Sequence, residues 1–371
     1  MSAGAHRNEP CWCGSGKKFK KCHIERHKER ALPPEAIIRQ ARSAGAWKTC
    51  LHPDASAETC GKVIGAHTLQ KRRTLRHLID SSNHVSTFYP YQPDAGGTMP
   101  KLQRRGWHQA STFEGFCSIH DDATFAAAEK SDTIITAPAV FALSYRALCH
   151  ELYQKVWGQR TEAHERTLAD RGLTPSAQRA MQRVYDVRAA GRNKAITQLW
   201  NLKARADREL LSGDYAGWHF AILRFDGPLC LATAGTTTPT WDLNGRPLQV
   251  LHDPEAELEH LYVSVVSGTE DDVAVVFGWR IEHAAPEALL ESLLSRDPDD
   301  VGSWVAQYVF AHLENVYFAH SWWLTLTEVD QQHMRELAVN SNPYYEVPAY
   351  VPSRLVPWTF TGTVGILGRT A

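Results

Sequence analysis

Four residues near the N-terminus have the chemistry and the spacing of metal ligands: Cys11, Cys13, Cys22 and His23. Three thiolates and one imidazole complete the closed tetrahedral shell in which proteins hold structural zinc. Glycines between the second and third ligands permit the unusual backbone turns that so short a loop requires. Because such a segment cannot bury a hydrophobic core, we expect the bound metal to supply its folding free energy.

The segment PCWCGSGKKFKKCH resembles the SEC-C motif, which is named after the zinc-binding carboxyl-terminal tail of the preprotein translocase ATPase. The pattern of that motif is Cys-x-Cys-x8-Cys-His/Cys, and all four ligand positions match. The resemblance covers residues 10–23, so it identifies a module and not the whole protein. It implies docking onto a partner protein or the ribosome, and the motif is typical of bacterial proteins.

A second group of candidate ligands lies between residues 47 and 125. Cys50 and Cys60 share one loop, and Cys117 and His120 form a Cys-x-x-His pair much further along the chain. The two pairs form the halves of a split zinc site. His67 competes with His120 for the fourth place, so the sequence predicts a second zinc ion and leaves its fourth ligand open.

His52 is a less regular extra ligand in the same region, and the surplus of histidines suggests acid–base chemistry. The pattern is similar to HNH-type treble-clef nucleases, in which a β-hairpin carries a general-base histidine and a helix carries the remaining ligands. That resemblance implies that His67 is the base, that Asp121 takes the place of the metal-binding histidine, and that Mg²⁺ or Mn²⁺ is the catalytic ion. Asp121 is also well placed to cap a helix, which is the structural alternative.

Basic residues accompany both predicted zinc sites. Residues 1–110 carry 19 Lys or Arg against 8 Asp or Glu, whereas residues 111–371 carry 21 against 33. Such a basic region favours polyanionic partners, although a charge run can also be a solvated face. The predicted contact residues are Lys17, Lys18, Lys20, Lys21, Lys71, Arg72, Arg73 and Arg76.

Helical periodicity and then strand periodicity dominate the remainder of the chain. We expect a helix from residue 138, with Arg146 and His150 facing solvent, and one helix or two over residues 174–211, with a break near Gly191. Four or five β-branched segments after residue 217 predict an antiparallel sheet, followed by further helices. The interval 81–116 reads as a long excursion. The fold class is α+β.

These observations predict a zinc module over residues 1–30, a treble-clef-like zinc region over residues 31–130, and an α+β domain of unknown role over residues 131–371. Without an apolar run long enough for a bilayer or an export signal, we expect a cytoplasmic protein that does not bind membranes. The predicted function is zinc-dependent docking of the basic region onto nucleic acid, the ribosome or an acidic protein. An HNH-like metal-dependent nuclease is the alternative. The oligomeric state is left open.

Overall fold

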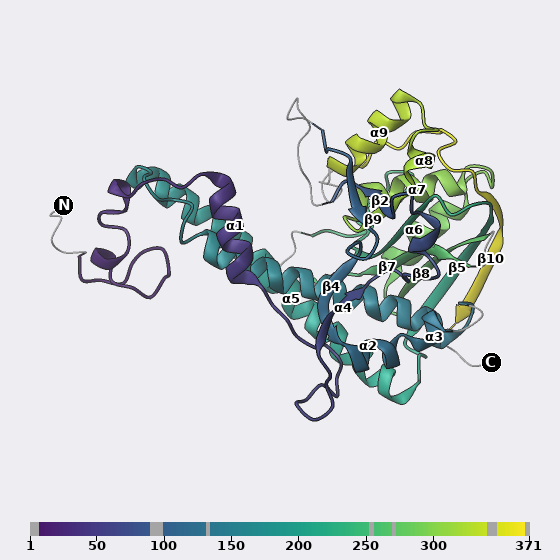
Figure 1. Ribbon diagram of the computed structural model, residues 1–371, viewed down its shortest axis with the longest axis horizontal. Coiled ribbons are helices and arrows are strands. Elements are labelled where there is room, and N and C mark those ends of the chain that lie inside the picture. Colours follow the sequence, from purple (N-terminus) through teal and green to yellow (C-terminus); the bar gives the residue numbers. More distant parts are fainter. Residues whose placement is uncertain are drawn as a thin grey trace. The chain divides into compact units, whose positions relative to one another are not determined.

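The computed structural model describes residues 7–89, 99–130, 134–251, 256–268, 272–339 and 347–367 (Figure 1). The chain forms two compact units, each built from two stretches of sequence. Unit 1 is Met1–Lys48 with Leu152–Asn201, and unit 2 is Thr49–Glu151 with Leu202–Ala371. The three consecutive domains drawn from the sequence stay a prediction, since compactness alone does not show which segments fold independently.

A helical hairpin forms the body of unit 1. It consists of the C-terminal part of α4 (Ala137–Glu165) and the N-terminal part of α5 (Pro175–Ser212). Side chains join them along their length, for example Arg192 Nη1 to Glu162 Oε2 at 2.6 Å. α5 is a single helix that runs through Gly191, because one glycine costs a helix only about 1 kcal/mol.

Helix α1 (Pro34–Gly45) begins at a proline, whose fixed φ suits a first helical turn, and it packs on the hairpin. The two helices lie so close together that a Cβ atom at Gly45 would collide with Thr161 of α4. Beyond the helix, the Tyr153 hydroxyl donates a hydrogen bond to the Trp47 carbonyl at 2.7 Å. The short 3₁₀ helices η1 (Phe19–Lys21) and η2 (Arg26–Lys28) precede α1.

Unit 2 is built on an antiparallel sheet of eight strands in the order β10-β5-β8-β7-β6-β9-β2-β3. The class α+β is therefore confirmed, and the sheet extends beyond the four or five strands expected. The added strands are short or lie far away in the sequence. The strands are β2 (His84–Thr87), β3 (Gln103–Gly106), β5 (Trp218–Asp226), β6 (Leu231–Thr237), β7 (Leu261–Ser267), β8 (Asp272–Arg280), β9 (Val316–Phe318) and β10 (Thr359–Leu367).

Helices cover both faces of this sheet because successive side chains of its central strands alternate between two apolar layers. On one face α4 approaches so closely that a Cβ atom at Gly278 would strike the Ser144 hydroxyl. On the other face, α6 (Ala284–Leu294) and α7 (Val301–His312) pack with Leu261 and Phe277 in one apolar cluster. Two further helices, α8 (His320–Trp323) and α9 (Glu328–Val339), follow β9.

A second, smaller sheet carries the residues of chemical interest. Strand β1 (Val63–His67) pairs antiparallel with β4 (Thr112–Cys117), and α2 (Ser118–Thr124) begins directly after β4. The expected excursion over residues 81–116 is wrong in part, because β2 and β3 from this interval join the large sheet. Residues 90–98 of that interval lie outside the described residues.

Buried hydrogen bonds fix the His67–Thr112 end of the β1–β4 strand pair to the large sheet. Tyr317 of β9 accepts a hydrogen bond from the Ser111 backbone at 2.7 Å, and the Asn315 amide donates to Thr68 Oγ1 at 2.7 Å. Unsatisfied polar groups at such depth would cost about 1 to 3 kcal/mol each. The position of His67, next to Thr68, is therefore tied to the sheet.

Arg146 corrects a prediction made from the sequence. It lies off the apolar stripe of its helix and was expected to face solvent, yet its exposed fraction is 1%. Periodicity identifies the most apolar face of a helix, but it does not show that a second element covers the opposite face. Among the described residues, no helix has the length and apolar character needed to cross a membrane.

Candidate metal centres and an adjoining pocket

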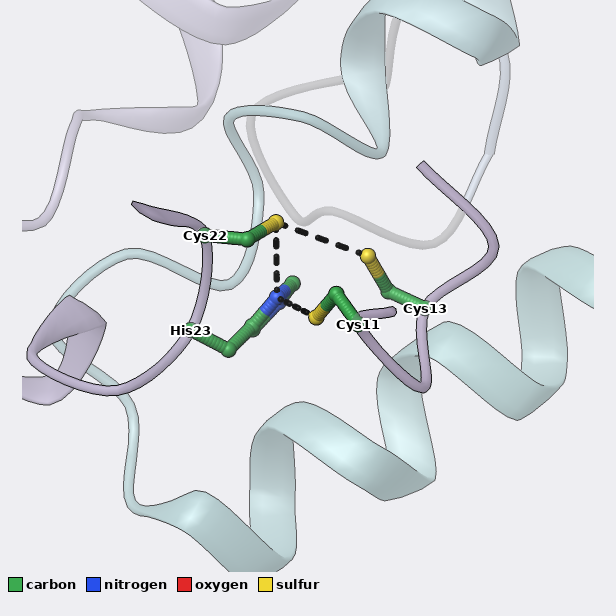
Figure 2. A group of neighbouring side chains, drawn as sticks. All are labelled: Cys11, Cys13, Cys22 and His23. Atoms are coloured by element: carbon green, nitrogen blue, oxygen red, sulfur yellow. Dashed lines mark hydrogen bonds between the residues drawn. The ribbon is translucent and has the colours of Figure 1, made fainter. Parts of the chain in front are cut away.

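The four predicted ligands of the first centre converge at one point in unit 1 (Figure 2). Cys22 and His23 follow η1, and Cys11 and Cys13 precede a turn in which Gly14 and Gly16 adopt φ values of +74° and +70°. These left-handed conformations favour glycine and reverse the chain within the loop. The Sγ atoms of Cys13 and Cys22 lie 3.6 Å apart, and His23 Nδ1 lies 3.2 Å from the Sγ atoms of Cys11 and of Cys22.

These separations fit a tetrahedral zinc shell. With Zn–S bonds of about 2.3 Å and Zn–N bonds of about 2.0 Å, tetrahedral geometry separates two sulfurs by about 3.8 Å and a sulfur from a nitrogen by about 3.5 Å. All four donor atoms lie within 4.8 Å of one another. The residues present therefore hold a metal ion of zinc type without rearrangement.

A hydrogen bond at Nε2 of His23 leaves Nδ1 as the ring atom that would bind a metal. His23 Nε2 lies 2.7 Å from Asp170 Oδ2, and Asp170 is fully buried in the turn between α4 and α5. Arg26 and Gln182 also donate hydrogen bonds to this carboxylate. Burial raises the pKa of Asp170, but the hydrogen bonds from His23, Arg26 and Gln182 outweigh burial and lower the pKa to about 2. A carboxylate in this position orients a ligating imidazole and raises its basicity.

The thiols of the first centre differ in their acidity. Burial raises the pKa of Cys11 to about 12. Burial acts in the same direction on Cys13, but hydrogen bonds from Ser15 outweigh it and lower the pKa of Cys13 to about 7. Cys13 thus presents a thiolate to an incoming cation more readily than Cys11 does.

The second centre lies in unit 2 and joins a loop, a strand end and a helix. The loop segment that contains Cys50 lies beside β4, since the Leu51 amide donates a hydrogen bond to the Gly115 carbonyl at 2.9 Å. Cys117 ends β4 and caps α2, and His120 occupies the first turn of that helix. His120 Nδ1 lies 3.4, 3.5 and 3.3 Å from the Sγ atoms of Cys50, Cys60 and Cys117.

The geometry resolves the choice that the sequence left open, because His120 and not His67 joins the three sulfurs. His52 does not join them either. Its ring stacks on that of His120, with centroids 4.1 Å apart. Burial raises the pKa of Cys117, but backbone hydrogen bonds from His120 and Gly61 outweigh burial and lower the pKa to about 7. Burial raises the pKa of Cys50 to about 11.

His67 and Asp121 line one pocket beside the second centre, with a volume of about 690 Å³. The pocket lies within unit 2 and also receives Glu129 from α3 (Ala126–Glu129). All four basic residues that the sequence predicted for this region line it as well, namely Lys71, Arg72, Arg73 and Arg76. Residues distant in the sequence thus form one pocket in which His67 and Asp121 lie among basic side chains.

His67 is neutral and presents a bare ring nitrogen. A hydrogen bond to the Trp107 backbone engages one side of the ring, while Nε2 is buried and has no hydrogen-bond partner among the described residues. Burial, and then the charges of Lys71 and Arg146, lower its pKa to about 4. An imidazole in this state is unprotonated at neutral pH, so Nε2 is open to a proton, although the lowered pKa makes it a weaker base than a free imidazole.

Asp121 faces the same pocket from the first turn of α2. Its Oδ1 atom is buried and has no hydrogen-bond partner among the described residues. Burial raises the pKa of the carboxyl to about 6, while the charge of Arg146 acts against this rise. Such a carboxylate is available to a hard cation, which takes oxygen ligands.

Arg146 is a residue of this region that sequence reasoning missed. Its Nη2 atom lies 2.5 Å from Glu129 Oε1, and its guanidinium stacks 3.8 Å from the centre of the Phe125 ring. Nε and Nη1 are buried and have no partner among the described residues. Arg146 thus supplies a fixed positive charge to both His67 and Asp121.

We expect two zinc ions per chain in metal analysis of the purified protein. Cys11→Ser and Cys117→Ser should each reduce the content to one ion, because each removes a thiolate from a different centre. A content of two ions in either variant would contradict the assignment of that cysteine.

Asp170→Asn should weaken metal binding at the first centre by about 10-fold or more, since outer partners of a ligating histidine commonly contribute that much. Competition with a chromophoric chelator measures the effect, and the second centre serves as internal reference. Glu162→Gln is the matched control, because Glu162 lies in the same unit and pairs with Arg192 at 2.6 Å, not with His23. Equal affinities in the two variants would refute a role for Asp170.

His67 should make stability depend on pH. Its pKa is about 4 in the folded protein and 6.5 in the unfolded chain, so its contribution is complete above pH 6.5 and is lost as pH falls towards 4. Between pH 7.5 and pH 5.5, wild type should lose about 1 kcal/mol more unfolding free energy than His67→Gln. Urea unfolding at both pH values tests this. Metal loss affects both proteins alike, and identical pH dependence would contradict the burial argument.

Comparison with known proteins found a match for the segment that carries the first centre. No curated protein and no solved structure matches the chain. Residues 7–24 match the family model of the SEC-C motif, and this segment contains all four ligands of the first centre. The resemblance seen at residues 10–23 is therefore confirmed, and the N-terminal segment is a SEC-C motif that carries a metal-binding group.

Proposed function

We propose that this protein binds zinc and nucleic acid, and that the pocket of unit 2 hydrolyses phosphodiester bonds with the help of a divalent cation. The single observation that carries the proposal is the convergence of His67, Asp121 and four basic residues in one pocket beside a Cys₃His centre. The antiparallel pair β1–β4, with α2 directly after β4, also supports an HNH-like element, although the long segment that carries β2 and β3 connects the two strands.

Electrostatics supports phosphate as the ligand of the pocket. Five of its lining residues are Lys or Arg, including Lys130, and three are Asp or Glu. Arg72 and Arg76 are exposed at the pocket, where a phosphate backbone can reach them. Lys and Arg supply most of the affinity for nucleic acid by releasing condensed counterions.

The acidic residues suit the divalent cation that hydrolysis requires. Mg²⁺ is usually bound by one or two carboxylates together with substrate phosphates, and Asp121 and Asp122 both line the pocket. When bound, Mg²⁺ or Mn²⁺ supplies charge stabilisation at the scissile phosphate. Asp121 would hold that cation, and His67 Nε2 would take a proton from the attacking water. Arg146 would keep both groups in their present ionisation states.

We further propose that zinc is the ion of both Cys₃His centres, since this donor set is typical of structural zinc. Thiolate ligands require a reducing compartment, which supports a cytoplasmic location. The SEC-C motif also supports docking onto a ribosome or an acidic protein as a second candidate function. Lys17, Lys18, Lys20 and Lys21 are all exposed on its loop.

Plasmid nicking in the presence of Mg²⁺ or Mn²⁺ tests the hydrolytic function. His67→Ala should lower the rate by about 100-fold or more, as expected for a general base. Asp121→Asn should lower it and raise the cation concentration needed for half-maximal rate. His84→Ala is the matched control, because His84 lies in the same unit and does not line the pocket.

Binding and cleavage are separated by a second measurement. The double variant Arg72→Ala, Arg76→Ala should weaken plasmid binding without abolishing cleavage at saturating protein. Absence of nicking by the zinc-loaded wild type, or full activity of His67→Ala, would overturn the nuclease assignment. Retained binding in that case would leave the nucleic-acid part of the proposal standing.

A further inference from the structure

The compact units divide the charge of the chain more sharply than the linear sequence does. Unit 1 holds 20 Lys or Arg against 8 Asp or Glu, and unit 2 holds 20 against 33. The net charges are +12 and −13. The basic character therefore belongs to the SEC-C segment, α1 and the helical hairpin, although the hairpin lies in the part of the sequence that is acidic overall.

The acidic residues of unit 1 cannot neutralise this charge, because most already have partners within the unit. Asp170 is shared by His23 and Arg26, and Glu165 accepts a hydrogen bond from a tyrosine. Four more carboxylates form pairs, which are Glu25 with Lys28, Glu29 with Arg171, Glu162 with Arg192, and Asp186 with Arg166. Exposed cations therefore remain in excess, among them Lys17, Lys18, Lys20, Lys21, Arg179 and Arg183.

An exposed tryptophan lies within this cationic surface. Trp12 is held between the ligands Cys11 and Cys13, and 38% of its surface is exposed. Its ring lies 4.5 Å from that of His23, and the guanidinium of Arg179 lies 5.8 Å from its centre. The metal loop thus fixes the Trp12 ring beside an arginine and leaves part of its surface accessible.

The backbone of the SEC-C loop brings Lys17 and Lys18 beside the segment that carries Trp12. The Cys11 amide donates to the Lys17 carbonyl at 2.7 Å, and Lys18 forms a bridge with Pro10. On α5, Arg183 is exposed four residues after Arg179, a spacing at which like charges repel. A polyanion bound here would relieve that repulsion.

We infer that this surface, which we call the Trp12 face, binds single-stranded nucleic acid. It consists of Trp12, Lys17, Lys18, Lys20, Lys21, Arg179 and Arg183. The Trp12 ring stacks on an unpaired base, and the lysines and arginines contact the flanking phosphates. A base in a duplex is already stacked on both sides, so the exposed ring favours a single strand over a duplex. The inference rests on the proposed function only in taking nucleic acid as the partner, and it uses no residue of the pocket.

Fluorescence anisotropy of the full-length zinc-loaded protein with a labelled single-stranded oligonucleotide, and with the duplex of the same sequence, tests the inference. Trp12→Ala should weaken single-strand binding by about 5-fold or more, since base–aromatic stacking contributes at least that much. Trp12→Phe should retain most of the affinity. Trp200→Ala is the matched control, because Trp200 is 41% exposed on α5 of the same unit, and it should bind like wild type.

A second variant leaves the metal loop untouched. Arg179→Gln with Arg183→Gln should reduce the slope of log affinity against log salt by about 1.4, the value for two phosphate contacts to a single strand. Zinc content is measured for every variant, so that unfolding of the loop is recognised. If Trp12→Ala loses zinc, this arginine pair and Trp12→Phe decide the outcome.

Two results would overturn the inference. One is wild-type affinity in both Trp12→Ala and the double arginine variant. The other is tighter binding of an acidic polypeptide, polyglutamate, than of the oligonucleotide, which would mark the Trp12 face as a protein-docking surface. Failure of the nuclease proposal is distinguished by His67→Ala and Asp121→Asn, which should bind the single strand like wild type.

Discussion

The junction between β4 and α2 is the constraint on which the candidate active region depends. Cys117 ends the strand and His120 lies in the first helical turn, so a tetrahedral metal shell on these ligands would set the angle at which the helix leaves the sheet. Asp121, the next residue, then faces the pocket that His67 reaches from β1. A metal of purely structural type would thereby position two groups that do not bind it.

The first centre performs a comparable task at the turn of the helical hairpin. The SEC-C segment is too short to bury a core, and its ligand His23 is anchored by a carboxylate from the α4–α5 turn. Arg26 adds a second link, since it donates to the Thr167 carbonyl as well as to Asp170. Metal binding and packing of the hairpin turn are therefore coupled in unit 1, whereas a motif read from the sequence looks autonomous.

The opposite charges of the two units suggest a division of labour. Unit 1 has a surplus of cations, which in our proposal attracts a polyanion over distance, and unit 2 gathers five basic residues in one pocket although its net charge is negative. The net negative charge of unit 2 opposes binding of a polyanion elsewhere on it, so binding would depend on this local cluster or on a separate basic surface. The buried guanidinium of Arg146 acts at shorter range and holds the charge states of His67 and Asp121.

The sequence by itself determined the ligands of the first centre, the α+β class and the segments that form the central strands, because ligand spacing and residue periodicity are local properties. It also listed His67, Asp121 and the basic residues, but as separate candidates. Only the tertiary structure chose His120 over His67 as a ligand, buried Arg146, drew β2 and β3 into the large sheet and collected the basic residues in one pocket. Those outcomes depend on contacts between residues far apart in the chain, and no local pattern encodes which distant element will cover a given face.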